Sequence, residues 1–363
     1  MTAALGEWRD WRDDHAGWAA SLQISTEAID LYAASDVIDL HVDSFIWNRI
    51  VGYDLTQRHR TGLFNARFYS QCDLPRLREA QVRGAIWVIT TNPLRRQSRK
   101  GPTFFANFER LRGILASCDR DVALVRTVGE YRAARAAGKH AAWIGVQGGN
   151  AFESDLDQLR RIPDRLLIRV TLVHLSNSRL GHSSAPGGGK AGMTTLGRSL
   201  VEVLNEQRIF VDLAHINRQG FFDALDAHRR DLPPIVTHTG VTGVHPHWRN
   251  LDDEQIRAIA DRGGTIGVMY QSSFLGDPYW GGRASRIVDH LEHILSIGGE
   301  HCASLGSDWD GAIITPRDMP TCLELPRLVQ LMLDRKWSSD RIGRVLGGNW
   351  LATLDRLRGG DGV

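Results

Sequence analysis

The sequence predicts an α/β fold: a single domain built on a (β/α)8 barrel with loop insertions. Eight short apolar segments alternate with helical segments along the chain. The apolar segments are nearly continuous, which is typical of parallel strands that are buried on both faces. The length of 363 residues suits one such barrel. An open doubly wound sheet is the alternative, but no G-x-G-x-x-G follows the first strand, so nothing indicates a dinucleotide site.

The expected elements follow one another in order. Residues 1–35 form a helical, tryptophan-rich lead-in packed on the barrel, and residues 36–363 form the barrel with its C-terminal helices. The predicted strands are 37–41, 85–90, 142–147, 167–174, 209–215, 235–239, 265–270 and 303–308. Helical patterns lie at 74–82, 104–116, 153–161, 196–206, 221–227, 253–262, 284–297 and in the tail, 327–357. Asp73 and Asp252 are suitable N-caps for two of these helices. Residues 181–195 are rich in glycine and serine, which predicts a mobile loop.

The composition is ordinary for a soluble globular protein, with 42% hydrophobic and 24% charged residues. The net charge is +2 and the basic residues are dispersed, so we expect no nucleic-acid or membrane partner. The four cysteines are far apart and lack C-x-x-C spacing, which argues against a cysteine zinc site and fits a reducing compartment. The N-terminus has no uninterrupted apolar segment, so a cytoplasmic location is expected.

Residues suited to metal binding stand where the predicted strands end. His41 and Asp43 end the first strand, and side chains two residues apart on a strand point the same way. Later strands end in His174, His215, His238 and Asp308. Active sites of barrels lie on the face formed by the carboxyl ends of the strands. Imidazole and carboxylate ligands there predict a site for zinc or a similar divalent ion.

The chemistry follows from these residue types. A metal-bound water loses a proton near neutral pH and becomes a nucleophile. An aspartate at the last strand, Asp308, can take and return that proton. His174 is placed to donate a hydrogen bond to a substrate oxygen. Arg249 is suited to bidentate binding of a carboxylate, although it is equally compatible with a packing role.

Several segments together resemble the membrane dipeptidase (renal dipeptidase) family of zinc peptidases, among the amidohydrolase-like barrels. The matching pieces are DLHVD (39–43), GVQGG (145–149), VTLVHLSN (170–177), GMTTLG (192–197), VDLAH (211–215), THTGV (237–241), RNLDDEQI (249–256), GSDWDG (306–311) and GGN (347–349). They span nearly the whole chain in the family's order. The resemblance implies a barrel with two zinc ions, hydrolysis of dipeptides, tolerance of a D-residue at the C-terminal position, and a homodimer.

The resemblance also implies roles for single residues. His41 and Asp43 would hold one metal with Asp308 near it, and His215 and His238 would hold the second. Asp308 would be the proton shuttle. His174 would polarise the scissile carbonyl and, with Arg249, bind the substrate, whose carboxylate Arg249 would receive.

Gln147 departs from the family pattern, which has a glutamate bridging both metals at this position. An amide side chain is neutral and binds one metal at most. Two dications about 3.5 Å apart repel by roughly 19 kcal/mol at an effective dielectric of about 20. Without a bridging carboxylate we therefore expect fewer than two tightly bound zinc ions. The nearest carboxylate downstream, Glu153, is expected in the next helix.

Three functions are compatible with the sequence. The first is a metal-dependent hydrolase that cleaves a dipeptide or similar small amide with a free carboxylate. The second is a repurposed family member, a tailoring enzyme for a peptide-like metabolite. The third is a non-catalytic protein that binds a carboxylate ligand, which is disfavoured because binding alone does not need the proton shuttle Asp308.

Overall fold

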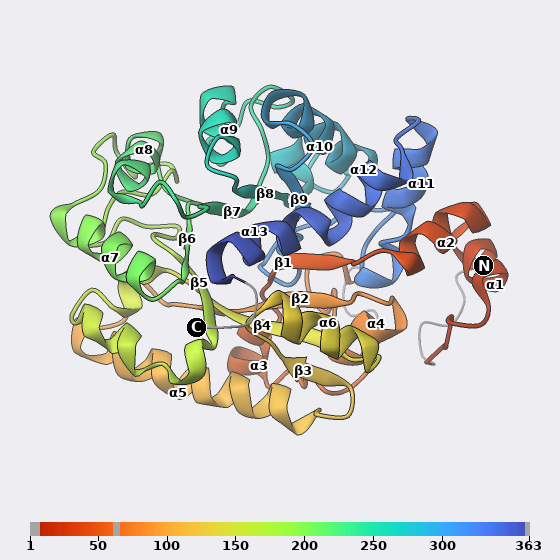
Figure 1. Cartoon of the computed structure of the whole chain (residues 1–363), viewed down its shortest axis with the longest axis horizontal. Coiled ribbons are helices and arrows are strands. Elements are labelled where there is room, and N and C mark those ends of the chain that lie inside the picture. Colours follow the sequence, from red (N-terminus) through yellow and green to blue (C-terminus); the bar gives the residue numbers. More distant parts are fainter. Residues whose placement is uncertain (1–7, 61–65, 360–363) are drawn as a thin grey trace.

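The computed structural model describes residues 8–60 and 66–359 and confirms the predicted barrel (Figure 1). Its strands are β1 (Ile38–Val42), β2 (Gly84–Thr90), β3 (Val122–Leu124), β4 (His140–Gln147), β5 (Leu167–Thr171), β6 (Phe210–Asp212), β7 (Ile235–Thr239), β8 (Thr265–Val268) and β9 (Ala303–Leu305). β1 pairs in parallel with both β2 and β9, and β2 pairs with β4, which closes the sheet into a barrel of eight strands.

All eight barrel strands lie where the sequence predicts them, and β3 is an addition. β3 pairs with the first residues of β4, and β5 pairs with the last residues of the same strand. β3 therefore extends the sheet outside the barrel. β3 has only three residues, and two of them are half-buried. Such a short segment gives too weak an apolar pattern to predict a strand.

Helices cover the outside of the barrel (Figure 1). They are α1 (His15–Leu22), α2 (Thr26–Ala34), α3 (Phe45–Val51), α4 (Leu74–Glu79), α5 (Gln97–Ser117), α6 (Val128–Ala136), α7 (Thr195–Glu206), α8 (Arg218–Ala227), α9 (Asp253–Ala260), α10 (Ser285–Gly298), α11 (Arg327–Asp334), α12 (Ser339–Gly343) and α13 (Asn349–Arg358). Short 3₁₀ turns are η2 (Gly149–Ala151), η3 (Leu156–Arg161), η4 (Pro163–Arg165), η5 (Ser272–Leu275) and η6 (Cys322–Glu324), and η7 (Arg344–Gly348) is a π turn.

The predicted helices are found with two kinds of exception. Residues 153–161 do not form an α-helix, since the helical part of this segment is η3. The short helices α3 and α6 were not predicted. Both predicted N-caps are confirmed: the Asp73 carboxylate accepts from the backbone N–H of Arg76, and Asp252 forms a capping box with Gln255.

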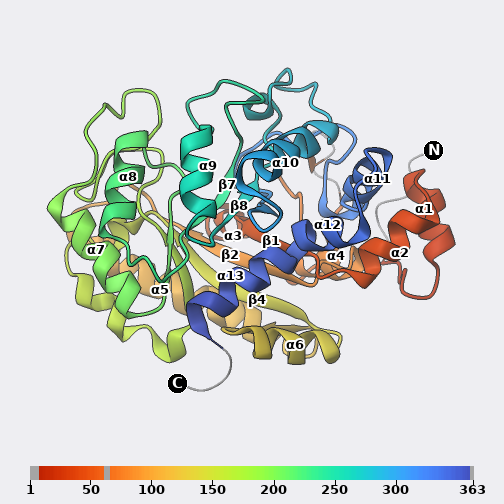
Figure 2. The same cartoon turned by 45° about the horizontal axis from the view of Figure 1, so that its top comes forward.

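The two ends of the described chain pack together. α2 contacts α11 and α12, and Figures 1 and 2 both show the N-terminal helices beside these two. Trp18 on α1 is buried and packs edge-on against Tyr32 on α2 at 5.7 Å. No helix within the described ranges is long and apolar enough to cross a bilayer.

Aromatic side chains fill the base of the barrel. Trp350 on α13 packs against Trp143 on β4 and Phe210 on β6, with ring centres 5.8 and 5.1 Å apart. All three rings are fully buried. The polar residues predicted at the strand ends stand at the opposite end, so the site can open only toward the carboxyl ends of the strands.

Candidate active site

The end of β1 is tied to the segment that follows β9. The N–H of Asp43 donates to the Trp309 carbonyl at 2.8 Å, and the N–H of Asp308 donates to the His41 carbonyl at 3.0 Å. These backbone bonds place three predicted site residues side by side. Nε2 of His41 lies 3.6 Å from Oδ1 of Asp308 and 4.0 Å from Oδ2 of Asp43.

Two more predicted histidines face each other from neighbouring strands of the barrel. His215 follows β6, His238 is on β7, and their Nε2 atoms are 2.8 Å apart. The His41 ring lies 3.7 Å from the His238 ring, and the His174 ring lies 4.7 Å from that of His215. The structure therefore brings together the histidines predicted from four different strands.

Three of these residues form a group suited to a metal ion. His41, His238 and Asp308 each offer a ligand atom, and the three atoms lie within 4.8 Å of one another. Asp43 and His215 flank this group. Whether each residue can act as a ligand depends on its hydrogen bonds, which differ between the histidines.

The backbone is strained at the site. His215 and Asp308 have φ angles of 67° and 62°, in the left-handed region that side chains bearing a Cβ seldom adopt. Such conformations cluster at functional sites, where the surrounding structure holds them. Sequence patterns do not reveal them, because neither residue is a glycine.

Burial sets the protonation of the site. It raises the pKa of Asp43 to about 6 and, together with the charge of Asp43, raises the pKa of Asp308 well above its usual value. Burial and the nearby Arg249 lower the pKa of His174 to about 3. The Thr90 hydroxyl donates to Oδ1 of Asp43 at 2.5 Å and orients that carboxylate. The site thus combines neutral imidazole with carboxyl groups able to hold a proton.

Gln147 is the last residue of β4, and its Oε1 atom is buried with no hydrogen-bond partner in the described structure. An orphaned buried oxygen is costly unless a ligand or ion satisfies it. Glu153, the nearest carboxylate downstream, has other partners. It pairs with Lys100 and accepts from the backbone N–H of Arg179.

Arg249 is buried beside His238. Its guanidinium donates to the His238 carbonyl at 2.5 Å, and its Nε has no partner among the described residues. Burial lowers the pKa of Arg249 to about 10. A cavity of about 140 Å³ is lined by His215, Arg249, Trp248 and Thr242, among others. A small anionic group there can reach both Arg249 and His215.

The loop between β5 and α7, for which the composition predicts mobility, is tied to the rest of the barrel by several contacts. The Ser183 hydroxyl donates to the His174 carbonyl at 2.5 Å. The Asn217 side chain donates to the carbonyls of Gly189 and Ala191, and Ser183 forms a bridge with Ile216. This loop therefore positions His174.

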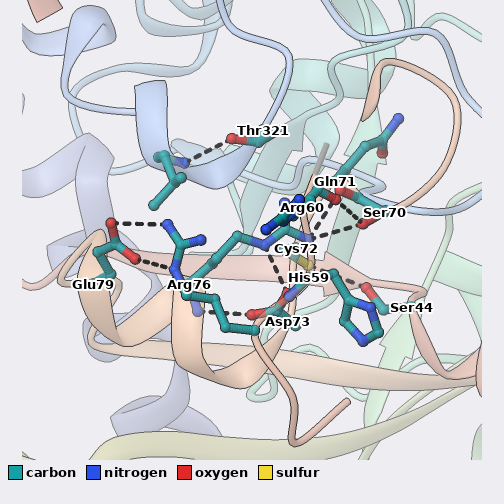
Figure 3. A network of polar contacts seen from close by, with 12 residues as sticks. Ser44, His59, Arg60, Ser70, Gln71, Cys72, Asp73, Arg76, Glu79 and Thr321 are labelled. Atoms are coloured by element: carbon teal, nitrogen blue, oxygen red, sulfur yellow. Dashed lines mark hydrogen bonds and ion pairs between the residues drawn. The ribbon is translucent and has the colours of Figure 1, made fainter. Parts of the chain in front are cut away.

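Asp310, at the end of the motif GSDWDG, has a structural role. Its carboxylate accepts from the Ser44 hydroxyl at 2.5 Å and from the backbone N–H of Gln71 at 2.8 Å. The neighbouring network, in which Arg76 donates to Asp73 at 2.7 Å, holds the segment before α4 in place (Figure 3). Asp310 thereby fixes the turn that carries Asp308.

Two residues that organise the site, Asp212 and Arg169, were not among the predicted site residues. Asp212 on β6 accepts at Oδ2 from Arg169 at 2.9 Å, from Thr171 at 2.6 Å and from Thr237 at 2.8 Å. Arg169 on β5 also donates to Nδ1 of His41 at 2.8 Å. An arginine inside the apolar segment LLIRVTLV was the available signal for Arg169, because an unpaired charge is seldom buried in a strand.

His238 fits a divalent metal ion, and Nε2 of His215 lies 2.8 Å from its Nε2, while Nδ1 of His215 has no hydrogen-bond partner among the described residues. Thr237 gives its hydroxyl proton to Asp212, so its oxygen accepts from Nδ1–H of His238 at 2.9 Å. This assignment leaves the lone pair of His238 on Nε2, which faces Nε2 of His215. A histidine that donates from one nitrogen and ligates with the other is the arrangement found in metal sites.

His41 does not fit in the same way. Its Nδ1 contacts the Arg169 guanidinium, which has no lone pair and can only donate. Its Nε2 is buried and has no hydrogen-bond partner in the part of the chain that the structure describes. The two halves of the predicted site therefore differ in their hydrogen bonds: Nδ1 of His238 donates, whereas Nδ1 of His41 accepts.

Comparison with known proteins identifies the class of this barrel. Residues 25–357 match the family of membrane dipeptidases (Peptidase family M19). The match covers nearly the whole chain, so the protein belongs to this family of metallopeptidases.

Solved structures agree. A dipeptidase of this family, described as a metallopeptidase, superposes with a TM-score of 0.80 at 25% identity, covering 90% of this chain and 99% of that one. A metallopeptidase from Rhodobacter sphaeroides, liganded with a phosphinate mimic of the dipeptide L-Ala-D-Ala, gives 0.79 at 24% identity, covering 89% and 99%.

Among curated proteins, an uncharacterized protein in the pqqA 5′ region of Klebsiella pneumoniae is 33% identical over 171 residues. The match covers 46% of this chain and 61% of that relative.

Proposed function

We propose that this family member is a metal-dependent hydrolase that cleaves a dipeptide, or a similar small amide, bearing a free carboxylate. The observation that carries the proposal is the facing pair of Nε2 atoms of His215 and His238, 2.8 Å apart at the open end of the barrel. Asp308 and Arg249 stand beside this pair. A divalent ion held there, with zinc the expected metal, supplies a Lewis acid and lowers the pKa of a water molecule.

The chain's own residues supply the remaining steps. Asp308 has a raised pKa, so it can accept a proton from the attacking water and return it to the leaving amine. His174, with a pKa of about 3, is neutral and donates a hydrogen bond to the carbonyl oxygen as negative charge develops. Arg249 binds the substrate carboxylate, for which its unpartnered Nε and its place on the cavity are suited.

Gln147 supports a second candidate: a family member that acts on another peptide-like substrate as a tailoring enzyme. The neutral amide with its orphaned Oε1 differs from the carboxylate of the family pattern, and a changed metal site permits changed chemistry. The two candidates share the barrel, Asp308 and Arg249, and differ in substrate.

The test uses the purified chain and a panel of L,L- and L,D-dipeptides, N-acyl amino acids and C-terminally amidated dipeptides. We expect hydrolysis of a substrate with a free carboxylate that is lost on chelation and restored by Zn²⁺ or Co²⁺. Asp308→Asn is the matched control for contaminating peptidase. Hydrolysis that is insensitive to chelation, or equal in the control, contradicts the proposal, and turnover of N-acyl amino acids alone favours the second candidate.

A cytoplasmic location and a homodimer belong to the same proposal. All four cysteines are free thiols, which supports a reducing compartment. Cell fractionation and light scattering of the purified protein test the two points.

A further inference from the structure

Arg169 is a buried cation at the centre of the barrel. One guanidinium nitrogen donates to Oδ2 of Asp212 at 2.9 Å and another to Nδ1 of His41 at 2.8 Å. Arg169, Asp212 and His41 are all fully buried. On the neighbouring strand Gly145 stands opposite Arg169, and a Cβ at Gly145 would come within 2.8 Å of the Arg169 Nε. The strand pair is therefore shaped to admit this arginine.

The contact with Arg169 determines where the His41 ring carries its proton. Nδ1 accepts from the guanidinium, so the hydrogen of the neutral ring lies on Nε2. Nε2 then has no lone pair to offer a metal. A doubly protonated ring is also unsuitable, because it would set N–H against N–H at Nδ1.

His238 has the opposite arrangement in the same network. Its Nδ1–H donates to Thr237, so its Nε2 keeps the lone pair. Asp212 organises both rings: it accepts from Thr237, which sets His238, and from Arg169, which sets His41. One buried carboxylate thus fixes two histidines in opposite tautomers.

We infer that His41 is not a metal ligand in this protein, because Arg169 holds the hydrogen of its ring on Nε2, and that the barrel carries a single metal site at His215 and His238. The inference deepens the proposed function and rests on it for the identity of the site. It also gives the Gln147 replacement a physical reason, because a single ion needs no bridging carboxylate.

In this arrangement His41 is a positioning residue. Its Nε2 lies 3.6 Å from Oδ1 of Asp308 and 4.0 Å from Oδ2 of Asp43, so its N–H places positive partial charge beside both carboxyl groups without a hydrogen bond to either. Asp308 also has an oxygen within 4.8 Å of a ring nitrogen of His238, so it stands between His41 and the single metal site.

The first test reads the tautomer directly by ¹⁵N NMR of the histidine rings in the unmodified protein. We expect the His41 signal to show a protonated Nε2 and an unprotonated Nδ1, both with and without added Zn²⁺. The signal is identified by its loss in His41→Gln or, if that variant does not fold, by its shift in Arg169→Gln. A protonated Nδ1, or Nε2 bound to Zn²⁺, overturns the inference.

The second test titrates apoprotein with Zn²⁺ and with Co²⁺ by calorimetry, with no substrate present. We expect His41→Gln to bind one ion with an affinity within about threefold of the wild type, and His238→Gln to lose at least 100-fold. Equal loss in both variants overturns the inference.

The outcomes separate the inference from the proposed function. Normal metal binding and the expected tautomer, without hydrolysis of any substrate, contradict the proposed function alone. Failure of the wild type to bind Zn²⁺ or Co²⁺ overturns the metal part of the inference and the proposed function together, while the tautomer still decides the role of His41.

Discussion

Restoring a second metal ion should require two substitutions together. Gln147→Glu supplies a carboxylate at the end of β4, but Arg169 still holds the ring hydrogen of His41 on Nε2 and adds a positive charge. Arg169→Gln removes that charge, but the carboxylate remains absent. We therefore expect one ion per chain in the wild type and in each single variant, and two ions in the double variant.

The size of the Arg169 effect follows from its position. The contact between Arg169 and Nδ1 of His41 is 2.8 Å. Adding the width of the ring and a Zn–N bond places an ion on Nε2 of His41 about 7 Å from the guanidinium. At an effective dielectric of about 20, a unit charge and a dication at about 7 Å repel by about 5 kcal/mol. Each 1.4 kcal/mol changes a dissociation constant about tenfold. Removing the charge of Arg169 should therefore strengthen metal binding at His41 by about three orders of magnitude.

The substitution should leave the fold intact. Without Arg169, Asp212 still accepts from the hydroxyls of Thr171 and Thr237 and from the backbone N–H groups of Ala214 and Thr237. No buried carboxylate is left without donors. Arg169→Lys is the matched control, since it keeps the positive charge and should stay at one ion even in combination with Gln147→Glu.

The assay is metal content by elemental analysis after dialysis, combined with calorimetric titration of the apoprotein. Two stoichiometric ions in Gln147→Glu with Arg169 unchanged would refute the reasoning, because they would show that the arginine does not oppose the second site. One ion in the double variant would refute it equally.

Other predictions test single residues. Asp308→Asn should lower kcat by about 10²- to 10⁴-fold, the usual contribution of a proton-transferring group, while inhibitor affinity measured by calorimetry stays largely intact. Arg249→Met should raise KM for substrates with a free carboxylate by roughly 10- to 100-fold, the value of a hydrogen bond to a charged group; an amidated dipeptide, already a poor substrate, should be unaffected. Burial lowers the pKa of His140 to about 4, below its unfolded value, so its contribution to stability is complete above pH 6.5 and is lost as the pH falls. Between pH 7 and pH 5 this loss is about 2 kcal/mol, and urea unfolding at the two pH values should show a smaller difference for His140→Gln.

Much of the fold and the candidate site could be predicted from the sequence, because both depend on local patterns. Buried parallel strands are continuous apolar segments, and His41, His215 and His238 stand at the ends of such segments. Closure of the parallel barrel then brings the carboxyl ends of the strands together, whatever the loops and the side-chain contacts are.

The opposite tautomers of His41 and His238 could not be predicted in this way. They depend on which side chains of different strands meet, namely Arg169 with His41, and Asp212 with Thr237, the neighbour of His238 on β7. These contacts depend on the register between strands and on the space that Gly145 leaves for Arg169. Neither can be predicted from the sequence of a single strand. The left-handed backbone at Asp308 was hidden for the same reason.

The decisive measurement is the number of divalent ions that the dialysed wild-type protein holds, taken together with its hydrolysis of dipeptides. We expect one tightly bound ion per chain and hydrolysis that disappears when that ion is chelated. Two stoichiometric ions, or hydrolysis that survives complete removal of metal, would contradict this expectation.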